Sequence, residues 1–398
     1  MLFRETDLRQ LAKNLKFTKR TPRKIDVINL LAAVCTECLQ GSPSCNDLAA
    51  RIQTLSGHTP SRQAVSLRLN QAFADLVQQL LEKVINQKVT GNASPGLEPL
   101  PAFRNYRRVL VQDSTIIKLP GHLFEDFSGV ANAHASVCNA RIQATYNLLD
   151  HRLLAVTIDP YSKNYQTAAP ELSLQKDDLV LRDRGYLVMD EIQRHREAGA
   201  DCIYQHRTGT TYLDPQSGEP IDLLALLKNQ GALDLEVLLN NAARTRVRLL
   251  SVPVDVETAN RRRCKAKIET HGHRPSKAVL ELMDWTIFIT TIPAALASYG
   301  LRWRVEIIFK AWKNHLQFPL LHRVSKLQLA ILLKARLLII TACINLALGT
   351  LERTLRQNYN PQLSLLKFTR FLSKSPARYC CYDQRQRQNY PKMWDALA

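Results

Sequence analysis

The stretch Arg108-Val-Leu-Val-Gln-Asp113 is a short apolar run that ends in an acid, and Leu179-Val-Leu-Arg-Asp183 repeats the pattern. Runs of roughly four to eight residues rich in Val and Leu are typical of strands buried inside a sheet. The two runs therefore predict central strands of an α/β core. Each strand is expected to end in a carboxylate, Asp113 in the first case and Asp183 in the second.

Further strand patterns follow these two runs or lie between them. By the same criteria, strands are expected at 140–149, 153–159, 202–205, 246–254 and 285–292. A helix is expected from Leu187 to Ala198. The mixed polar and β-prone stretch 206–283 indicates a β-rich insertion, in which Arg261–Lys267 is interpreted as a basic loop.

Residues 1–90 have the pattern of an all-helical domain. An amphipathic helix with Asn46 as its expected N-cap is followed by the polar turn 56–60 and a second helix that exposes Arg62 and Arg68. Helix, glycine-containing turn and basic second helix are typical of a helix-turn-helix that binds DNA. A plain helical hairpin gives the same pattern, so the charge of the chain is what favours DNA.

The charge is strongly positive, with 54 Lys and Arg against 35 Asp and Glu, a formal net charge of +19. The excess is spread along the chain: residues 1–24 hold eight Lys or Arg and two acids, and residues 350–398 hold nine and three. A long polyanion such as DNA fits this spread better than an anionic membrane or a small acidic substrate does. The alternative is a basic soluble protein without such a partner. An apolar fraction of 45% excludes global disorder.

The nine cysteines are scattered, and no CxxC pair is followed by a second pair, so a zinc ribbon is unsupported. Cys35 and Cys38 are interpreted as small core residues. The pair His271 and His273 is more typical of phosphate contact or solvation than of a metal site. We expect no signal peptide, because charge follows Met1-Leu-Phe-Arg, and no membrane span, because the apolar run 337–348 is too short. That run is expected to be a buried helix. The scattered cysteines fit a protein of the reducing cytosol.

The stretch 299–316 carries the most informative side chains. On a helix, residues seven apart differ by only about 20° in their direction around the axis, so they lie on the same face. One face of this helix would therefore carry a stripe of a carboxylate, three cations and a phenol. The stripe consists of Tyr299, Arg302, Glu306, Lys310 and Lys313. A second, apolar stripe would hold the helix against a core; it consists of Leu301, Val305, Ile308, Trp312 and Leu316. Taken alone, the first stripe is also compatible with a solvated face.

Three acids together suggest metal chemistry. Asp113, Asp183 and Glu306 would repel one another if they met without compensation, and their pKa values would rise. One or two Mg²⁺ ions, which prefer oxygen ligands, remove that penalty and can activate water against a phosphodiester. The alternative for an aspartate at a strand end is a turn or cap residue.

These residues resemble a known family. The spacing Tyr299-x2-Arg302-x3-Glu306-x6-Lys313 is similar to the signature of the insertion-sequence-four family of DDE transposases, and 302–313 looks like its Tn-five branch. Val111–Thr115 resembles the block of the first aspartate, and Asp183–Tyr186 that of the second. The three blocks occur in the family's order.

The resemblance implies an α/β, RNase H-like mixed-sheet catalytic core with a β-rich insertion and an all-helical N-terminal domain. The implied domains are a helical DNA-binding domain at 1–95, the core at 105–205 and 284–350, the insertion at 206–283 and a basic C-terminal region at 351–398 that could serve dimerisation. Residues 91–101 are the expected linker.

The resemblance also implies the chemistry. Asp113, Asp183 and Glu306 would bind two Mg²⁺, with Mn²⁺ as a substitute. Tyr299, Arg302 and Lys313 would grip phosphates, Lys310 would add a phosphate contact, and Trp303 would stack on a flipped base or pack against the core. In the family, water nicks the transposon end and the freed 3′-hydroxyl attacks DNA, by way of a hairpin.

The expected function is therefore a cut-and-paste DNA transposase that binds terminal inverted repeats and joins the 3′-OH ends to target DNA. The expected partners are DNA and a second copy of the chain in a homodimer on DNA, without a membrane, in the bacterial cytoplasm at the nucleoid. Two alternatives remain open: a nuclease without strand transfer, and a catalytically silent DNA-binding inhibitor derived from a transposase. The presence of all three acids argues against the silent protein.

Overall fold

The computed structural model describes residues 4–20, 24–86, 103, 105–129, 137–149, 152–164, 169–269, 275–292 and 325–342. The chain divides into two units. Unit 1 consists of residues 1–98, 114–170 and 304–398, and unit 2 consists of residues 99–113 and 171–303.

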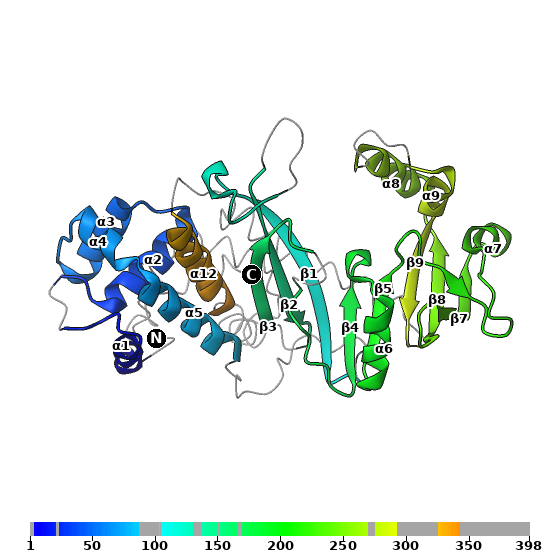
Figure 1. The fold of residues 1–398 in the computed structure, drawn as a ribbon, viewed down its shortest axis with the longest axis horizontal. Helices are drawn as coiled ribbons and strands as arrows, with labels where there is room; N and C mark the ends of the chain where they lie inside the picture. Colours follow the sequence, from blue (N-terminus) through cyan, green and yellow to red (C-terminus); the bar gives the residue numbers. More distant parts are fainter. Residues whose placement is uncertain are drawn as a thin grey trace, which may run out of the picture. The chain divides into compact units, whose positions relative to one another are not determined.

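Unit 1 contains a group of packed helices. Their bounds are α1 (Glu5–Asn14), α2 (Val27–Gln40), α3 (Cys45–Ser56), α4 (Arg62–Arg68), α5 (Gln71–Asn86) and α12 (Lys326–Ala342). The described residues before 87 hold only helices and turns, so the prediction of an all-helical N-terminal domain is confirmed. The late helix α12 packs against α5 and α2, although more than half the chain separates them in sequence (Figure 1).

Helix α12 is buried on nearly every side. From Leu329 to Ala342 its described side chains are almost all buried, and this all-round apolar pattern is typical of a helix enclosed by others. The predicted buried helix is thus confirmed for residues 337–342, although it begins at Lys326 rather than at Leu337; the rest of the run, 343–348, lies outside the described residues. Helix α5 supplies the facing surface with residues such as Phe73, Leu76 and Leu80.

One buried cation joins α12 to α2. The Arg336 side chain is fully buried, and its Nε donates a hydrogen bond to the Cys38 carbonyl at 2.8 Å. A second guanidinium nitrogen donates to the Gly41 carbonyl. The last carbonyls of a helix lack partners within it, so Arg336 acts as a C-terminal cap for α2. Cys35 and Cys38 are buried as predicted, and burial raises the pKa of the Cys38 thiol to about 12.

The start of α3 differs from the expectation. Ser44 is the N-cap: its Oγ accepts a hydrogen bond from the Asp47 amide at 3.2 Å, and the Asp47 carboxylate accepts one from the Ser44 amide at 2.8 Å. The prediction of Asn46 as the cap was therefore wrong. A reciprocal capping box satisfies two backbone amides, whereas Asn46 as the cap would have satisfied one. The helix therefore starts closer to the N-terminus than was expected, at Cys45.

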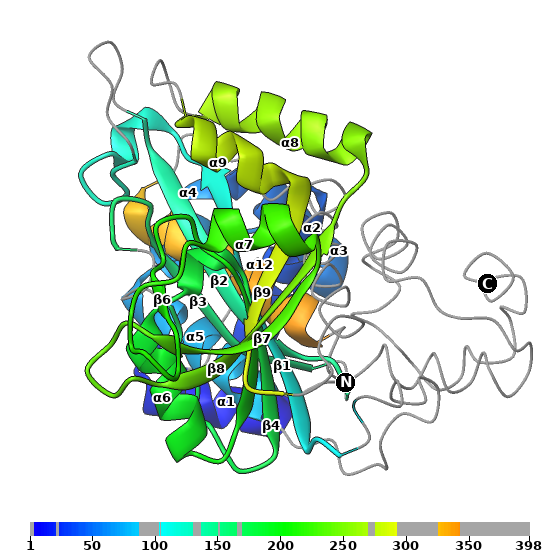
Figure 2. The same ribbon diagram turned by 90° about the vertical axis from the view of Figure 1, so that its right-hand side faces the viewer.

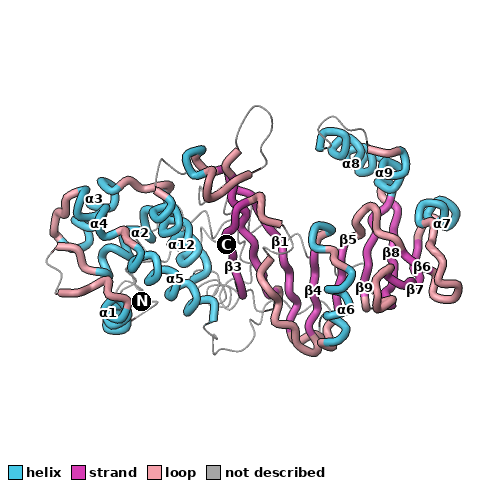
Figure 3. The backbone as a smooth tube through the Cα atoms, viewed as in Figure 1, coloured by secondary structure: helices cyan, strands magenta, loops and turns pink. Residues whose placement is uncertain are grey.

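Nine strands form one mixed sheet in the order β3-β2-β1-β4-β5-β9-β8-β7-β6 (Figures 1 and 3). Their bounds are β1 (Arg108–Lys118), β2 (Asn139–Asn147), β3 (Arg152–Pro160), β4 (Asp178–Arg182), β5 (Asp201–Gln205), β6 (Tyr212–Leu213), β7 (Leu233–Leu239), β8 (Arg246–Pro253) and β9 (Trp285–Thr290). The units share β1: residues up to Asp113 belong to unit 2 and those from Ser114 to unit 1.

The pairing identifies the core. Strands β2 and β3 form an antiparallel hairpin, whereas β1, β4 and β5 run parallel to one another. Helix α6 (Met189–Glu197) supplies the crossover that parallel strands β4 and β5 require, close to the predicted helix 187–198. A hairpin β2–β3, then β1, β4 and β5 in parallel, is the strand arrangement of an RNase H-like fold. The predicted fold class is confirmed.

The insertion lies between β5 and β9 in sequence and contains both strands and helices. Strands β6, β7 and β8 extend the sheet beyond β9 in antiparallel pairs. Its helices are α7 (Leu223–Gln230), α8 (Val256–Glu269) and α9 (Lys277–Glu281). Helices α8 and α9 pack against the short 3-10 helix η4 (Leu282–Asp284), which leads into β9 (Figure 2).

The basic segment Arg261–Lys267 is helical, so the expectation of a loop there was wrong. Tertiary hydrogen bonds explain the difference. Arg262 donates to the Trp285 carbonyl at 3.1 Å and to the Thr286 hydroxyl at 2.9 Å, while Arg263 donates to the Leu280 carbonyl at 3.2 Å. His271 and His273 lie outside the described residues. Within the described part of the chain, no helix has the length and apolar character needed to cross a membrane.

The Arg336 cap yields a stability prediction. Arg336→Met keeps much of the side-chain volume but leaves buried carbonyls of α2 without a donor, which should cost about 2–4 kcal/mol. Hydrogen exchange followed by mass spectrometry should show faster exchange across residues 27–41. Lys334→Met on the same helix is the matched control and should leave exchange there unchanged. Equal exchange in the two variants would contradict the assigned cap.

Candidate active site on two neighbouring strands

The pairing of β1 with β4 brings two predicted acids together. In this parallel ladder Arg108 lies opposite Asp178, and the register continues to the pair Gln112 and Arg182. Asp113 and Asp183 each follow the last pair by one residue. Because side chains alternate along extended strands, both point to the face opposite that of Gln112 and Arg182.

An ion pair at the other end of the ladder fixes this register. The Asp178 carboxylate is fully buried, and it accepts hydrogen bonds from Arg108 Nε at 2.8 Å and from Arg108 Nη2 at 2.5 Å. The Gln175 amide also donates to Asp178, at 2.8 Å. A two-pronged, mostly buried pair of this kind is geometrically specific. Five residues separate Arg108 from Asp113 and Asp178 from Asp183, so the ion pair sets the position of both acids.

Asp183 lies where β4 gives way to a turn. Its backbone is still extended, with φ −76° and ψ 164°, and it is the N-cap of the 3-10 helix η3 (Arg184–Tyr186). The carboxylate makes no capping hydrogen bond, so capping does not account for this side chain. Asp183 is partly exposed. Buried Tyr186 anchors the turn that follows it.

Asp113 differs in one respect from the expectation. It was predicted to end its strand, but β1 continues to Lys118. What ends after Gln112 is the ladder with β4, because β4 itself stops at Arg182. Asp113 is 8% exposed, an unusual degree of burial for a carboxylate unless it has partners or binds an ion.

The opposite face of β4 is occupied by structural contacts. Arg182 is 5% exposed, donates to the Tyr204 hydroxyl at 3.1 Å and lies over the ring of Tyr186. The His195 ring packs edge-on against Tyr204, and burial lowers the pKa of His195 to about 4. These contacts pack α6 and η3 onto the sheet, and they leave the face of Asp113 and Asp183 as the candidate site.

Two carboxylates on one face suit a hard divalent cation, which takes oxygen ligands. Within the described residues no group of three or more His, Cys, Asp or Glu side chains could hold a metal. Asp113 and Asp183 are the two members of the predicted three-acid site that the described residues include. The predicted third ligand, Glu306, lies outside the described residues, as do Tyr299, Arg302, Trp303, Lys310 and Lys313.

The two predicted DNA-binding arginines of the helical domain lie at opposite ends of α4. Arg62 begins this helix and is exposed. Arg68 is half-buried: it donates to the Phe17 carbonyl at 3.3 Å, and its guanidinium lies 5.4 Å from the centre of the Phe17 ring. Arg68 thus has a structural contact that the sequence pattern did not indicate.

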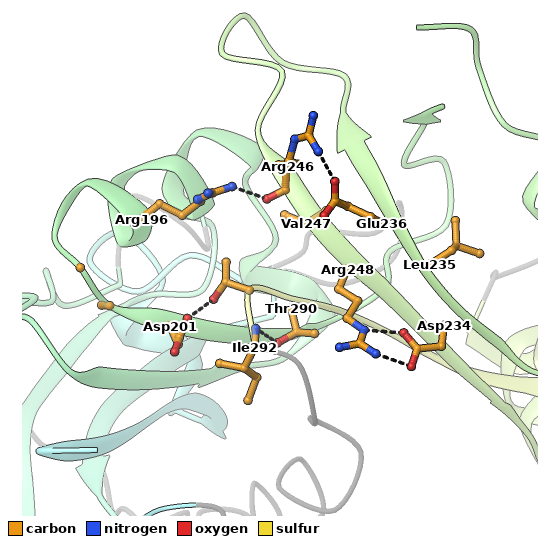
Figure 4. Close-up of a pocket in the computed structure, with 13 residues that line it drawn as sticks. Arg196, Asp201, Asp234, Leu235, Glu236, Arg246, Val247, Arg248, Thr290 and Ile292 are labelled. Atoms are coloured by element: carbon orange, nitrogen blue, oxygen red, sulfur yellow. Dashed lines mark hydrogen bonds and ion pairs between the residues drawn. The ribbon is translucent and has the colours of Figure 1, made fainter. Parts of the chain in front are cut away.

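A separate hollow of about 660 Å³ in unit 2 is lined by charged residues of α6, β7 and β8 (Figure 4). Two of its three cations are already paired with acids. Arg248 forms a two-pronged ion pair with Asp234, Arg246 pairs with Glu236, and Arg196 donates to the Arg246 carbonyl at 2.7 Å (Figure 4). Because acids on β7 neutralise the arginines on β8, this hollow has little positive charge left for an anion.

Comparison with known proteins identifies the family. Residues 105–346 match the family model described as the transposase DDE domain. This chain belongs to that family, as its sequence pattern predicted. The match spans both acids and the stretch that contains Glu306. Members of this family generally use divalent metal ions.

The relatives that match are transposases of bacterial elements. The transposase for insertion sequence element IS231E of Bacillus thuringiensis subsp. finitimus is 23% identical over 368 residues, which cover 84% of this chain and 76% of that protein. The transposase for IS1151 of Clostridium perfringens is 23% identical over 349 residues, covering 77% and 71%. A piggyBac transposase synaptic complex with hairpin DNA covers 98% of this chain and 80% of its own, at 10% identity and a TM-score of 0.45.

Sequence reasoning missed the ion pair that positions the acids. A signal was present: Arg108 opens the first strand pattern and Asp178, of opposite charge, immediately precedes the second, and each lies five positions before an acid. Equal spacing from a complementary pair would have predicted that the two strands are parallel neighbours. Neither strand pattern shows this when it is considered alone, because the equal spacing is visible only when the two are compared.

The ion pair gives a second prediction. Arg108→Ala leaves the Asp178 carboxylate buried without its partner, which should lower stability by about 3 kcal/mol or more. The exposed neighbour Arg107 is the matched control, because Arg107→Ala keeps the backbone hydrogen bond to Asp177. Urea unfolding of the two variants measures the difference. A decrease in Arg108→Ala no greater than in Arg107→Ala would show that the pair does not hold the ladder.

Proposed function

We propose that this chain is a cut-and-paste DNA transposase. It binds the terminal inverted repeats of its element, cleaves DNA by metal-dependent phosphodiester hydrolysis, and joins the freed 3′-OH ends to target DNA. The observation that carries the proposal is the placement of Asp113 and Asp183 one residue beyond a shared register pair, on one face of the core sheet. Family membership supports the same chemistry.

Asp113, Asp183 and Glu306 would hold Mg²⁺, with Mn²⁺ as a substitute. When bound, the ions supply an activated water and stabilise charge on the leaving oxygen of the phosphodiester. The protein's part is to hold the carboxylates in fixed positions. The Arg108–Asp178 pair and the pairing of β1 with β4 do so from the far end of the ladder.

The remaining roles concern DNA. Tyr299, Arg302 and Lys313 would grip phosphates near the cut, Lys310 would add a phosphate contact, and Trp303 would stack on a base. Arg62 and Arg68 would lie on the helix that contacts the terminal repeat, with Arg68 also tied to Phe17. The assignments between 299 and 313 follow the family's signature and the residues around it, whereas those of Arg62 and Arg68 follow the helix-turn-helix pattern.

The proposed domains are DNA binding at 1–95, catalysis at 105–205 and 284–350, the insertion at 206–283, and the basic region 351–398, which serves dimerisation. Helix α12, within 284–350, packs against α5 and α2 and so also completes the helical domain. Two copies would act together as a homodimer on two transposon ends. The proposed place of action is the bacterial cytoplasm, on the nucleoid.

The test uses the full chain with Mg²⁺ and a DNA that carries the terminal repeats of its own element. Asp113→Asn and Asp183→Asn should each lower end cleavage by more than about 100-fold, because even outer partners of metal ligands cost roughly 10–100-fold. End binding should persist. Asp177→Asn is the matched control: this aspartate is exposed at the other end of β4, and asparagine tolerates its φ of 64°.

The products decide between the three functions. Cleaved ends joined to target DNA support the transposase. Cleaved ends without joined product would show that the chain is a nuclease. Binding without cleavage by the wild-type chain would show that it is a silent inhibitor. Normal cleavage by Asp113→Asn or Asp183→Asn would remove that acid from the proposed site.

A further inference from the structure

A second hollow lies in the helical part of unit 1 and is lined almost wholly by basic and polar residues. Its volume is about 870 Å³. We call it the cationic pocket; its lining consists of Arg9, Lys13, Thr18, Lys19, Arg20, Lys24, Asp26, Asn29, Ser56 and His58. These residues come from α1, the segment that follows it, the start of α2, and the turn between α3 and α4.

The charge of the cationic pocket is not neutralised from within. Five cations face one acid, Asp26, and that acid pairs with Arg9 at 3.1 Å. Lys13, Lys19, Arg20 and Lys24 are exposed, and none of the four forms an ion pair with another described residue. The hollow of Figure 4 is the internal comparison, because there Arg246 and Arg248 are paired with acids. Of these two hollows, the cationic pocket is therefore the one with charge left for an anionic ligand.

The polar residues of the pocket add hydrogen-bonding groups. His58 Nδ1 lies 2.9 Å from the Ser56 carbonyl oxygen, which orients the ring on the turn between α3 and α4. Thr18 and Asn29 contribute a hydroxyl and an amide to the lining, whereas the Ser56 hydroxyl donates a hydrogen bond to the Ile52 carbonyl at 2.8 Å. Several cations combined with hydroxyl and amide groups are the set that proteins use for phosphate oxygens.

The pocket is physically linked to α4. Arg68, the last residue of that helix, is bonded to the Phe17 carbonyl, next to Thr18 of the pocket. The rest of α4 presents Arg62, Gln63 and Leu67 to solvent, and Leu67 is 77% exposed. A helix with exposed polar and apolar side chains is suited to base edges, whereas a pocket of lysines is suited to a charged backbone.

We propose that the cationic pocket binds the phosphodiester backbone of duplex DNA beside the bases that α4 contacts. The proposal takes its polyanion from the proposed function but does not depend on cleavage. It divides the work of the helical domain: the pocket supplies affinity that is independent of sequence, and α4 supplies the preference for the terminal repeat. Lysine ammonium groups act on phosphate as point charges, so the pocket carries no sequence information.

The test is a salt titration of DNA binding by the full chain. In the variant Lys13→Gln/Lys19→Gln/Lys24→Gln, affinity for a terminal-repeat duplex and for an unrelated duplex should fall by similar factors. The slope of log affinity against log salt should become shallower by about 0.9 for each phosphate that the variant no longer neutralises, or about 2–3 for the three lysines together. Lys83→Gln on α5 is the matched control, because Lys83 is exposed and lies outside the pocket. Its slope should match the wild type.

Two further arms make the result specific. Arg62→Ala should reduce the preference for the terminal repeat over the unrelated duplex, whereas the triple variant should leave that preference unchanged. Inorganic phosphate at matched ionic strength should compete with DNA better for the wild type than for the triple variant, because only the intact pocket binds phosphate oxygens. An unchanged salt slope in the triple variant, an equal decrease in Lys83→Gln, or equal phosphate competition in the wild type and the triple variant would overturn the proposal.

The binding measurements are made in the Asp113→Asn background, where the chain with an intact pocket serves as the wild-type reference, so that cleavage plays no part in them. Cleavage is measured separately in chains that retain Asp113. A wild-type chain that binds DNA through the pocket but never cuts would refute the proposed function and leave the pocket intact. Normal cutting by the wild-type chain together with an unchanged slope in the triple variant would refute the pocket and leave the proposed function intact.

Discussion

The ion pair between Arg108 and Asp178 is the contact on which the candidate site depends. It closes one end of the β1–β4 ladder with a buried carboxylate, and a slip of one residue would separate the two charges. The same slip would turn one of the two site aspartates to the opposite face. A single register therefore satisfies the buried charge and brings Asp113 and Asp183 together, so stability and chemistry select the same pairing.

Much of the fold could be predicted because hydrophobic period and strand length are local properties. The runs at Arg108 and Leu179 are short, apolar and bounded by charge, and both form parallel strands. The errors came where tertiary contacts decide. The charge of the segment Arg261–Lys267 suggested a loop, but hydrogen bonds from Arg262 and Arg263 to distant backbone keep it helical.

The residues of the candidate site could be predicted from the sequence, but the contacts that position them could not. Acids that follow strands are visible in sequence, whereas the burial of Asp178 and the meeting of two strands arise only on folding. The cationic pocket could not be predicted for a related reason. Its lysines are visible in sequence as part of an excess of charge, but their position around one hollow with Ser56 and His58 depends on how α1 packs near the turn after α3.

The place of α12 has a consequence for synthesis of the protein. The helical group that contains α2 and α5 receives its central helix, with the Arg336 cap, only after the ribosome has passed residue 342. Until then the apolar faces of α2 and α5 lack their cover. A nascent chain thus completes this helical group only after residues 299–316, the predicted catalytic helix, have been made. Folding order in this way ties completion of the helical group to synthesis of the stretch that contains Glu306.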